Sequence, residues 1–166
     1  WATTQGLVLS IGLQITITQV QTENLLADTP SGRVDRTVVV GGHLDSVAEG
    51  PGINDNGSGT AATLETALQM AQLGIKPTNR VRFAFWSGEE DGLIGSDYYV
   101  SQLSARDIKN TALNLNFDMV GSPNAVNFVY DGDGDALGVA GPNGSALIES
   151  VFTSFFTSAG SASVPT

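Results

Sequence analysis

Apolar and polar residues alternate with the period of a β-strand in several parts of the chain. The clearest example is residues 13–20, where Leu13, Ile15 and Ile17 alternate with glutamine and threonine, which predicts a strand with one apolar face. Residues 37–40 form a continuous β-branched run instead, which is typical of a strand buried on both faces. Further strands are predicted over residues 24–27, 81–86, 112–117 and 125–130, the last of them nearer an edge of the sheet.

Helical spacing of apolar residues predicts three helices between and after these strands. The first spans about residues 58–73, and Gly74 follows it at the position where glycine commonly ends a helix. The second and third are expected over about residues 93–103 and 144–158. No strand is expected in the tail that follows, residues 158–166.

Because strands and helices alternate, we expect one α/β domain over residues 1–166. Its sheet should be mixed but largely parallel and sandwiched by helices. Hydrophobic residues make up 41% of the 166 residues, which is typical of a globular protein. No apolar run approaches the roughly 20 residues of a membrane span. Seven basic residues and a net charge of −10 argue against a nucleic-acid partner, which needs a basic surface.

Acidic residues and the single histidine follow the predicted strands at their carboxyl ends. In open α/β sheets, ligands bind beyond this edge. The loops after three predicted strands therefore bring several candidate site residues to one rim. These residues are His43, Asp45, Asp55, Glu89, Glu90 and Asp118.

Each of these residues has a structural explanation when taken alone. A histidine at a strand end is often hydrogen-bonded, an aspartate in a Gly-Asn loop forms turns, and glutamates before a helix interact with its dipole. Together, however, crowded carboxylates repel one another, and a bound divalent cation removes that cost. The chain has no cysteine, so any metal site uses histidine and carboxylates. These ligands suit zinc, with manganese or cobalt as alternatives.

The same residue types suit hydrolysis. A metal ion lowers the pKa of a bound water and polarises a carbonyl group, and a nearby carboxylate that is not a ligand can accept the water's proton. The adjacent Glu89 and Glu90 can divide the roles of base and ligand between them. Asp45, two residues beyond His43, can orient the imidazole.

Four segments with characteristic spacing carry a family resemblance. They read GHLDS (42–46), GINDNGSG (52–59), WSGEEDGLIGS (86–96) and NFDMVG (116–121). In this order they resemble the M28 family of zinc peptidases, in particular secreted aminopeptidases of the Streptomyces type. The resemblance implies the α/β/α sandwich of zinc exopeptidases, an extracellular location, and removal of N-terminal residues from peptide substrates.

The resemblance also implies a role for each candidate residue. Two zinc ions would be bridged by Asp55, with His43 and Asp118 completing the first site and Glu90 binding the second ion. Glu89 would be the general base and Asp45 would hold His43. The peptide bond after Asp55 would be cis. The family takes a further histidine ligand from a loop nearer the C-terminus, whereas this chain has one histidine in total. The family also normally has helices before its first strands, and the part of this chain upstream of Gly41 looks short. We therefore expect a chain truncated at both ends, with an incomplete second site.

Two alternatives remain open at the level of sequence. One is a glutaminyl-cyclase-like enzyme with a single zinc ion, and the other is a catalytically impaired metal-binding fragment. A separate acidic run, Asp131-Gly132-Asp133-Gly134-Asp135, lacks the distal glutamate of an EF-hand. We interpret this run as a solvated loop rather than a calcium site.

Overall fold

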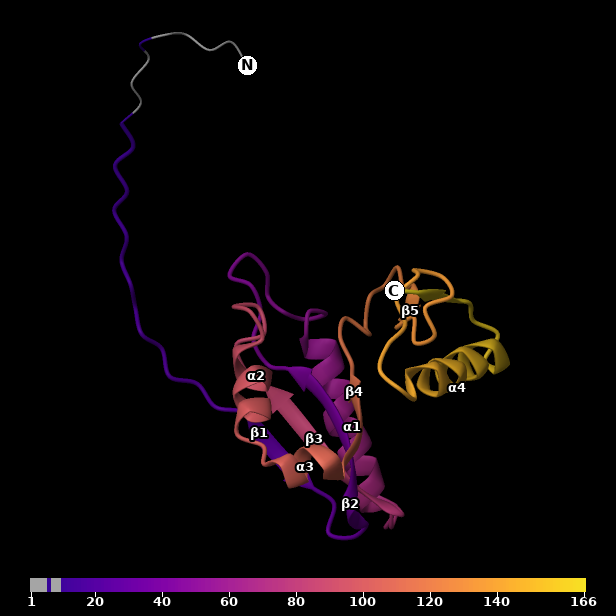
Figure 1. Ribbon diagram of the computed structural model, residues 1–166. Helices are drawn as coiled ribbons and strands as arrows, with labels where there is room; N and C mark the ends of the chain where they lie inside the picture. The colour runs from indigo at the N-terminus through magenta and orange to yellow at the C-terminus, as the bar shows by residue number, and fades with distance from the viewer. Residues whose placement is uncertain (1–5, 7–9) are drawn as a thin grey trace.

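The computed structural model describes Gly6 and residues 10–166 and places a four-stranded sheet at the centre of the chain (Figure 1). The strand order is β1-β3-β2-β4. Strand β1 is antiparallel to β3, whereas β2 is parallel to both β3 and β4. The mixed, largely parallel sheet is therefore confirmed. Its strands are β1 (Leu25–Asp28), β2 (Arg33–His43), β3 (Asn79–Trp86) and β4 (Thr111–Asn116).

Helices cover both faces of this sheet. Helix α1 connects β2 to β3, and helices α2 and α3 connect β3 to β4, on the other side of β2. Both crossovers join parallel strands, but they move across the sheet in opposite directions. Right-handed connections therefore place α1 on one face and α2 and α3 on the other (Figure 1). The bounds of these helices are α1 (Gly57–Gln72), α2 (Ile94–Ser101) and α3 (Ala105–Asn110).

The core lies where the two central strands meet. Val39 on β2 and Ala84 and Trp86 on β3 are buried and in contact, and Tyr99 of α2 packs against them. The ring centroids of Trp86 and Tyr99 are 5.1 Å apart. The continuous β-branched run lies in β2, where Thr37, Val39 and Val40 are buried, as expected for a strand covered on both faces.

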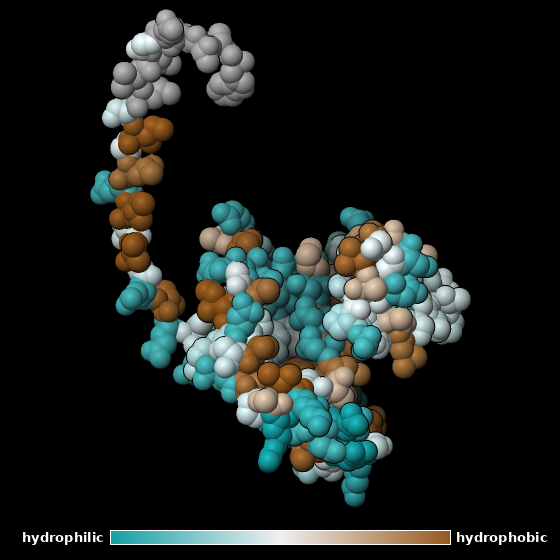
Figure 2. All heavy atoms as spheres, in the orientation of Figure 1, coloured by the Kyte–Doolittle hydropathy of each residue, from teal (hydrophilic) through white to brown (hydrophobic). Residues whose placement is uncertain are grey.

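The predicted strand over residues 13–20 is wrong. No residue from 10 to 24 belongs to a strand, and Ile15 and Ile17 are 74% and 86% exposed. The segment extends away from the sheet, and Figure 2 shows its hydrophobic residues alternating with polar ones along it. Alternation describes the two faces of a strand, but a strand forms only where a neighbouring edge accepts its hydrogen bonds.

The C-terminal part also differs from expectation. Strand β5 (Asn127–Val129) is not near an edge of the main sheet, because it pairs in parallel with β6 (Ser163–Pro165) in a separate two-stranded sheet. The tail after α4 (Ser145–Ser158) therefore does contain a strand. Strand β6 was missed because apolar periodicity over three residues is too short to reveal a strand.

Helix α3 was not predicted from apolar spacing. It is only six residues long, and a capping box between Ser104 and Asp107 begins it. A box of this kind satisfies backbone N–H groups that a short helix leaves free. None of the helices in the described part of the chain is long and apolar enough to cross a membrane.

Candidate metal centre

The carboxyl ends of three adjacent strands deliver the candidate residues to one rim. Strand β2 ends at His43, β3 ends three residues before Glu89, and β4 ends two residues before Asp118. Asp55 lies in the loop just before α1, which starts beside the end of β2. Parallel pairing of β2 with both neighbours aligns these ends, so the predicted rim is where the structure places the residues.

His43 is the centre of the group, and only 2% of its side chain is exposed. Its Nδ1 lies 3.0 Å from the backbone oxygen of Asp45, which can only accept a hydrogen bond. Nδ1 therefore carries a proton, and Nε2 points to the carboxylates. Nε2 lies 3.2 Å from Asp55 Oδ1 and 3.3 Å from Asp118 Oδ2, yet makes no hydrogen bond with any residue that the structure describes.

These separations match the edges of a metal polyhedron. Ligand atoms about 2.0–2.1 Å from a tetrahedral zinc ion lie about 3.3 Å from one another. The two contacts of His43 Nε2 have this length, and Asp55 and Asp118 complete a group whose ligand atoms lie within 4.8 Å of each other. A buried nitrogen facing two acids without a hydrogen bond fits a cation between them.

The two adjacent glutamates differ in their surroundings. Glu90 Oε1 is buried and has no hydrogen-bond partner among the described residues. The Glu89 side chain is 33% exposed, and its Oε2 lies 3.8 Å from His43 Nε2. Glu89 and Glu90 form a second possible ligand group with His43. The two groups thus share His43, whereas the resemblance assigns the shared role to Asp55.

Asp45 connects the His43 strand to the glutamate loop. Its two carboxylate oxygens each accept a backbone N–H bond of 3.0 Å, one from Glu89 and one from Glu90. Its carboxylate is 3.6 Å from His43 Nδ1, so the histidine is held by the backbone oxygen of Asp45 rather than by its side chain. Burial raises the pKa of Asp45, but the two N–H donors outweigh it and the pKa is lowered overall.

The negative charges at the rim act on the two groups that could carry a proton. Burial lowers the pKa of His43, but the charges of Asp118 and Glu89 together with the contacts to Asp45 outweigh burial, and the net pKa is raised. Burial raises the pKa of Glu89, and the nearby acids add to that effect against the opposing His43. The shift of His43, and the smaller part of the shift of Glu89 that comes from neighbouring acids, report negative charge that a cation would neutralise.

Two further residues hold the site and were not singled out from sequence. Thr60 Oγ1 donates a 2.6 Å hydrogen bond to the backbone oxygen of His43. Asn56, which is 1% exposed, follows Asp55 through a cis peptide bond, as the resemblance implied. Asn56 is also the N-cap of α1. Asparagine is a preferred N-cap, so its place before the predicted helix was the signal available in the sequence.

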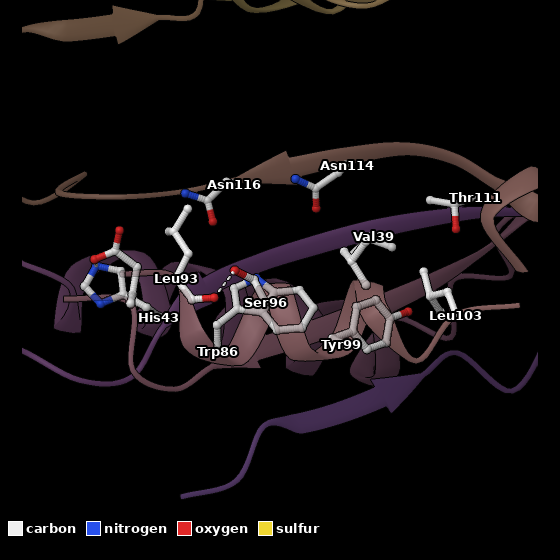
Figure 3. Close-up of a pocket in the computed structure, with 12 residues that line it drawn as sticks. Val39, His43, Trp86, Leu93, Ser96, Tyr99, Leu103, Thr111, Asn114 and Asn116 are labelled. Carbon is white, nitrogen blue, oxygen red and sulfur yellow. Dashed lines mark hydrogen bonds and ion pairs between the residues drawn. The ribbon is translucent and has the colours of Figure 1, made fainter. Parts of the chain in front are cut away.

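A pocket of about 270 Å³ opens beside His43 between α2 and the sheet (Figure 3). Trp86, Leu93 and Tyr99 line one side of it, and Asn114 and Asn116 of β4 line the other. Glu89 also borders this pocket, which therefore connects the acidic rim to a largely apolar wall.

The sequence profile of peptidase family M28 matches residues 24–166. The chain belongs to this family. The match includes all four predicted motifs and the whole rim.

Curated relatives of the M28 chain are much longer than it is. An aminopeptidase of Pseudomonas aeruginosa is 49% identical over 156 residues, which are 94% of this chain and 29% of the relative. A probable leucine aminopeptidase 2 of Aspergillus oryzae is 48% identical over 145 residues, 87% of this chain and 29% of the relative. The chain therefore spans less than a third of the length of these relatives.

Solved structures support the same fold. A zinc aminopeptidase of Bacillus subtilis is 31% identical with a TM-score of 0.61, over 86% of this chain and 39% of that one. An aminopeptidase of Aneurinibacillus is 28% identical with a TM-score of 0.59, over 86% of this chain and 38% of that one. The sheet and helices of the M28 chain are thus similar to part of these enzymes.

The acidic run at residues 131–135 is not simply a solvated loop. Asp131 is 2% exposed, and its carboxylate accepts backbone N–H bonds from Gly134 (2.9 Å) and Leu137 (2.6 Å). Glu149 of α4 accepts from the backbone of Gly132 and Asp133. Asp131, Asp133 and Glu149 also lie within 4.8 Å of one another. Backbone N–H groups of the loop therefore occupy the carboxylates of Asp131 and Glu149, and the bonds to Glu149 join the loop to α4.

Proposed function

We propose that this M28 chain carries the metal-binding and catalytic residues of a zinc-dependent aminopeptidase. The observation that carries the proposal is the buried Nε2 of His43, which faces Asp55 and Asp118 at ligand spacing and makes no hydrogen bond with the described residues. His43, Asp55 and Asp118 would hold one zinc ion, and Glu90 would contribute to a second. The names of the relatives favour aminopeptidase chemistry over the cyclase alternative.

The chain's own residues would divide the work of peptide hydrolysis. Bound zinc supplies Lewis acidity that activates water and polarises the scissile carbonyl. Glu89 would accept the proton of the attacking water and pass it to the leaving amine. Burial raises the pKa of Glu89, which brings it closer to the pH at which a general base works well. Its partial exposure leaves it accessible to substrate, unlike the buried oxygen of Glu90.

Asp45 would fix the loop that carries both glutamates. Its carboxylate accepts from the backbone N–H groups of Glu89 and Glu90, and so holds the backbone from which the two side chains extend. The excess of acids at the rim also suits the positively charged N-terminus of a peptide. Peptide substrates and secretion are predictions that this proposal retains.

Matched substitutions of the two glutamates test the proposal. In the chain saturated with zinc, Glu89→Gln should reduce release of a chromogenic amine from an aminoacyl anilide about 10²- to 10⁴-fold, because a general base contributes that much. Its zinc affinity, measured by calorimetric titration, should change little. Glu90→Gln should weaken zinc binding instead.

The two measurements separate the parts of the proposal. Undiminished turnover by the Glu89→Gln variant would remove Glu89 as the base. An unsubstituted chain that binds zinc but releases no amine would limit the proposal for this chain to metal binding. Failure to bind zinc at all would remove both parts.

A further inference from the structure

Asn56 is almost completely buried, and all the polar atoms of its side chain are used. Its Nδ2 donates a 2.9 Å hydrogen bond to the backbone oxygen of Phe117. Its Oδ1 accepts from the backbone N–H of Gly59 at 2.9 Å and of Met119 at 3.3 Å. The side-chain amide therefore joins the loop before α1 to the segment after β4.

The two bonds to the β4 segment lie on either side of a candidate metal ligand. Phe117 precedes Asp118 and Met119 follows it. The side-chain amide of Asn56 thus holds the backbone on both sides of Asp118. The backbone of Asn56 is joined to Asp55 by a peptide bond. Asp55 and Asp118 contact the same nitrogen of His43, so their mutual placement depends on this connection.

The carboxyl end of β2 packs against the same side-chain amide of Asn56. A Cβ added to Gly42, the residue before His43, would lie 3.2 Å from Asn56 Nδ2 and 3.0 Å from the Phe117 oxygen. A Cβ added to Gly59 would collide with the Phe117 oxygen and the Asn56 side chain. Both glycines therefore allow β2, α1 and the β4 segment to approach around Asn56.

We propose that Asn56 is a positioning residue that sets the placement of the candidate metal ligands His43, Asp55 and Asp118. This inference rests on the metal site of the proposed function. Only a primary amide presents a donor and an acceptor side by side at this length. A serine can still cap α1, but its hydroxyl is too short to reach across to the β4 segment.

That difference separates positioning from helix capping. Asn56→Ser should lower the urea unfolding midpoint less than Asn56→Ala does, because serine still caps α1 while both variants lose the bonds to Phe117 and Met119. It should nevertheless weaken binding of Co²⁺ about 10- to 100-fold, the range seen when a residue that orients metal ligands is lost. The visible absorption bands of the bound Co²⁺ should shift, because they report ligand geometry.

Two comparison variants complete the experiment. Asn56→Ala removes both functions and should lower the unfolding midpoint as well as the Co²⁺ affinity. Ser104→Ala removes the cap of α3 away from the rim, and should lower the midpoint without changing the affinity or the spectrum. An Asn56→Ser variant with unchanged Co²⁺ affinity and spectrum would overturn the inference.

Failure of the proposed function gives a different result. If the unsubstituted chain binds no Co²⁺, the metal site is wrong, and hydrogen exchange of the metal-free chain then decides the role of Asn56. Faster exchange of the Met119 amide in Asn56→Ser supports the connection between the two loops. Unchanged exchange of that amide overturns the connection too.

Discussion

The rim around His43 and the loop around Asp131 both bring acidic side chains within 4.8 Å of one another. In the Asp131 loop, backbone N–H groups of Gly134 and Leu137 occupy the buried carboxylate. At the His43 rim, the buried Nε2 and the buried Oε1 of Glu90 have no hydrogen-bond partner among the described residues. Clustering of acids is therefore a weak sign of a metal site, and the state of the buried lone pairs distinguishes the two clusters.

The largest expected effect is on zinc affinity at the His43 rim. His43→Ala removes the nitrogen that both candidate ligand groups share, so zinc binding should weaken by more than about 100-fold, beyond what loss of an orienting residue costs. Asp131→Asn should leave zinc affinity at the rim unchanged. Calorimetric titration of both variants checks the contrast, and equal weakening by the two would contradict it.

Substitutions in the Asp131 loop should lower the stability of the fold rather than the zinc affinity. Asp131→Ala leaves two N–H groups without their acceptor at a buried position, which should lower the free energy of unfolding by about 2 kcal/mol. Asp131→Asn keeps one acceptor oxygen and should lose less. Urea unfolding with and without a chelator provides the measurement, and a loss that appears only when metal is present would point to a bound cation.

The smallest expected effect is on the pH dependence of the metal-free chain. Because the pKa of His43 is raised, the folded state holds this proton more tightly than the unfolded state does. The resulting stability is present below about pH 6.5, the ordinary pKa of histidine, and is lost as the pH rises through the folded-state pKa. Zinc should reverse the sign of this dependence, because protons compete with the metal for His43 and the zinc-bound folded state no longer takes up the proton.

Unfolding experiments across this pH range, with a chelator or with zinc, test the prediction. His43→Gln is the control, since its neutral amide cannot titrate and should remove this part of the pH dependence. A metal-free chain that gains stability as the pH rises through the same range would show that the sign is wrong.

Several elements could be predicted from the sequence because the signal is local. The run at residues 37–40 became part of the central strand β2, and Gly74 follows α1 with a φ of +61°. Glu89, Glu90 and Asp118 could be assigned to one rim because parallel strands share an edge. The prediction of a strand over residues 13–20 was wrong because a local alternation of apolar and polar residues does not reveal whether a neighbouring strand is available to pair with it.

By itself, the sequence determined the alternation of strands and helices, the composition of the rim and the family motifs. The tertiary structure decided which buried side-chain atoms of the two acidic clusters bond to backbone donors and which have no hydrogen-bond partner among the described residues. It also gave Asn56 its three hydrogen bonds and Asp45 its hold on the glutamate loop. The bonds of Asn56 to Phe117 and Met119, and those of Asp45 to the glutamate loop, join residues 44 or more positions apart in the chain, and no local pattern specifies them.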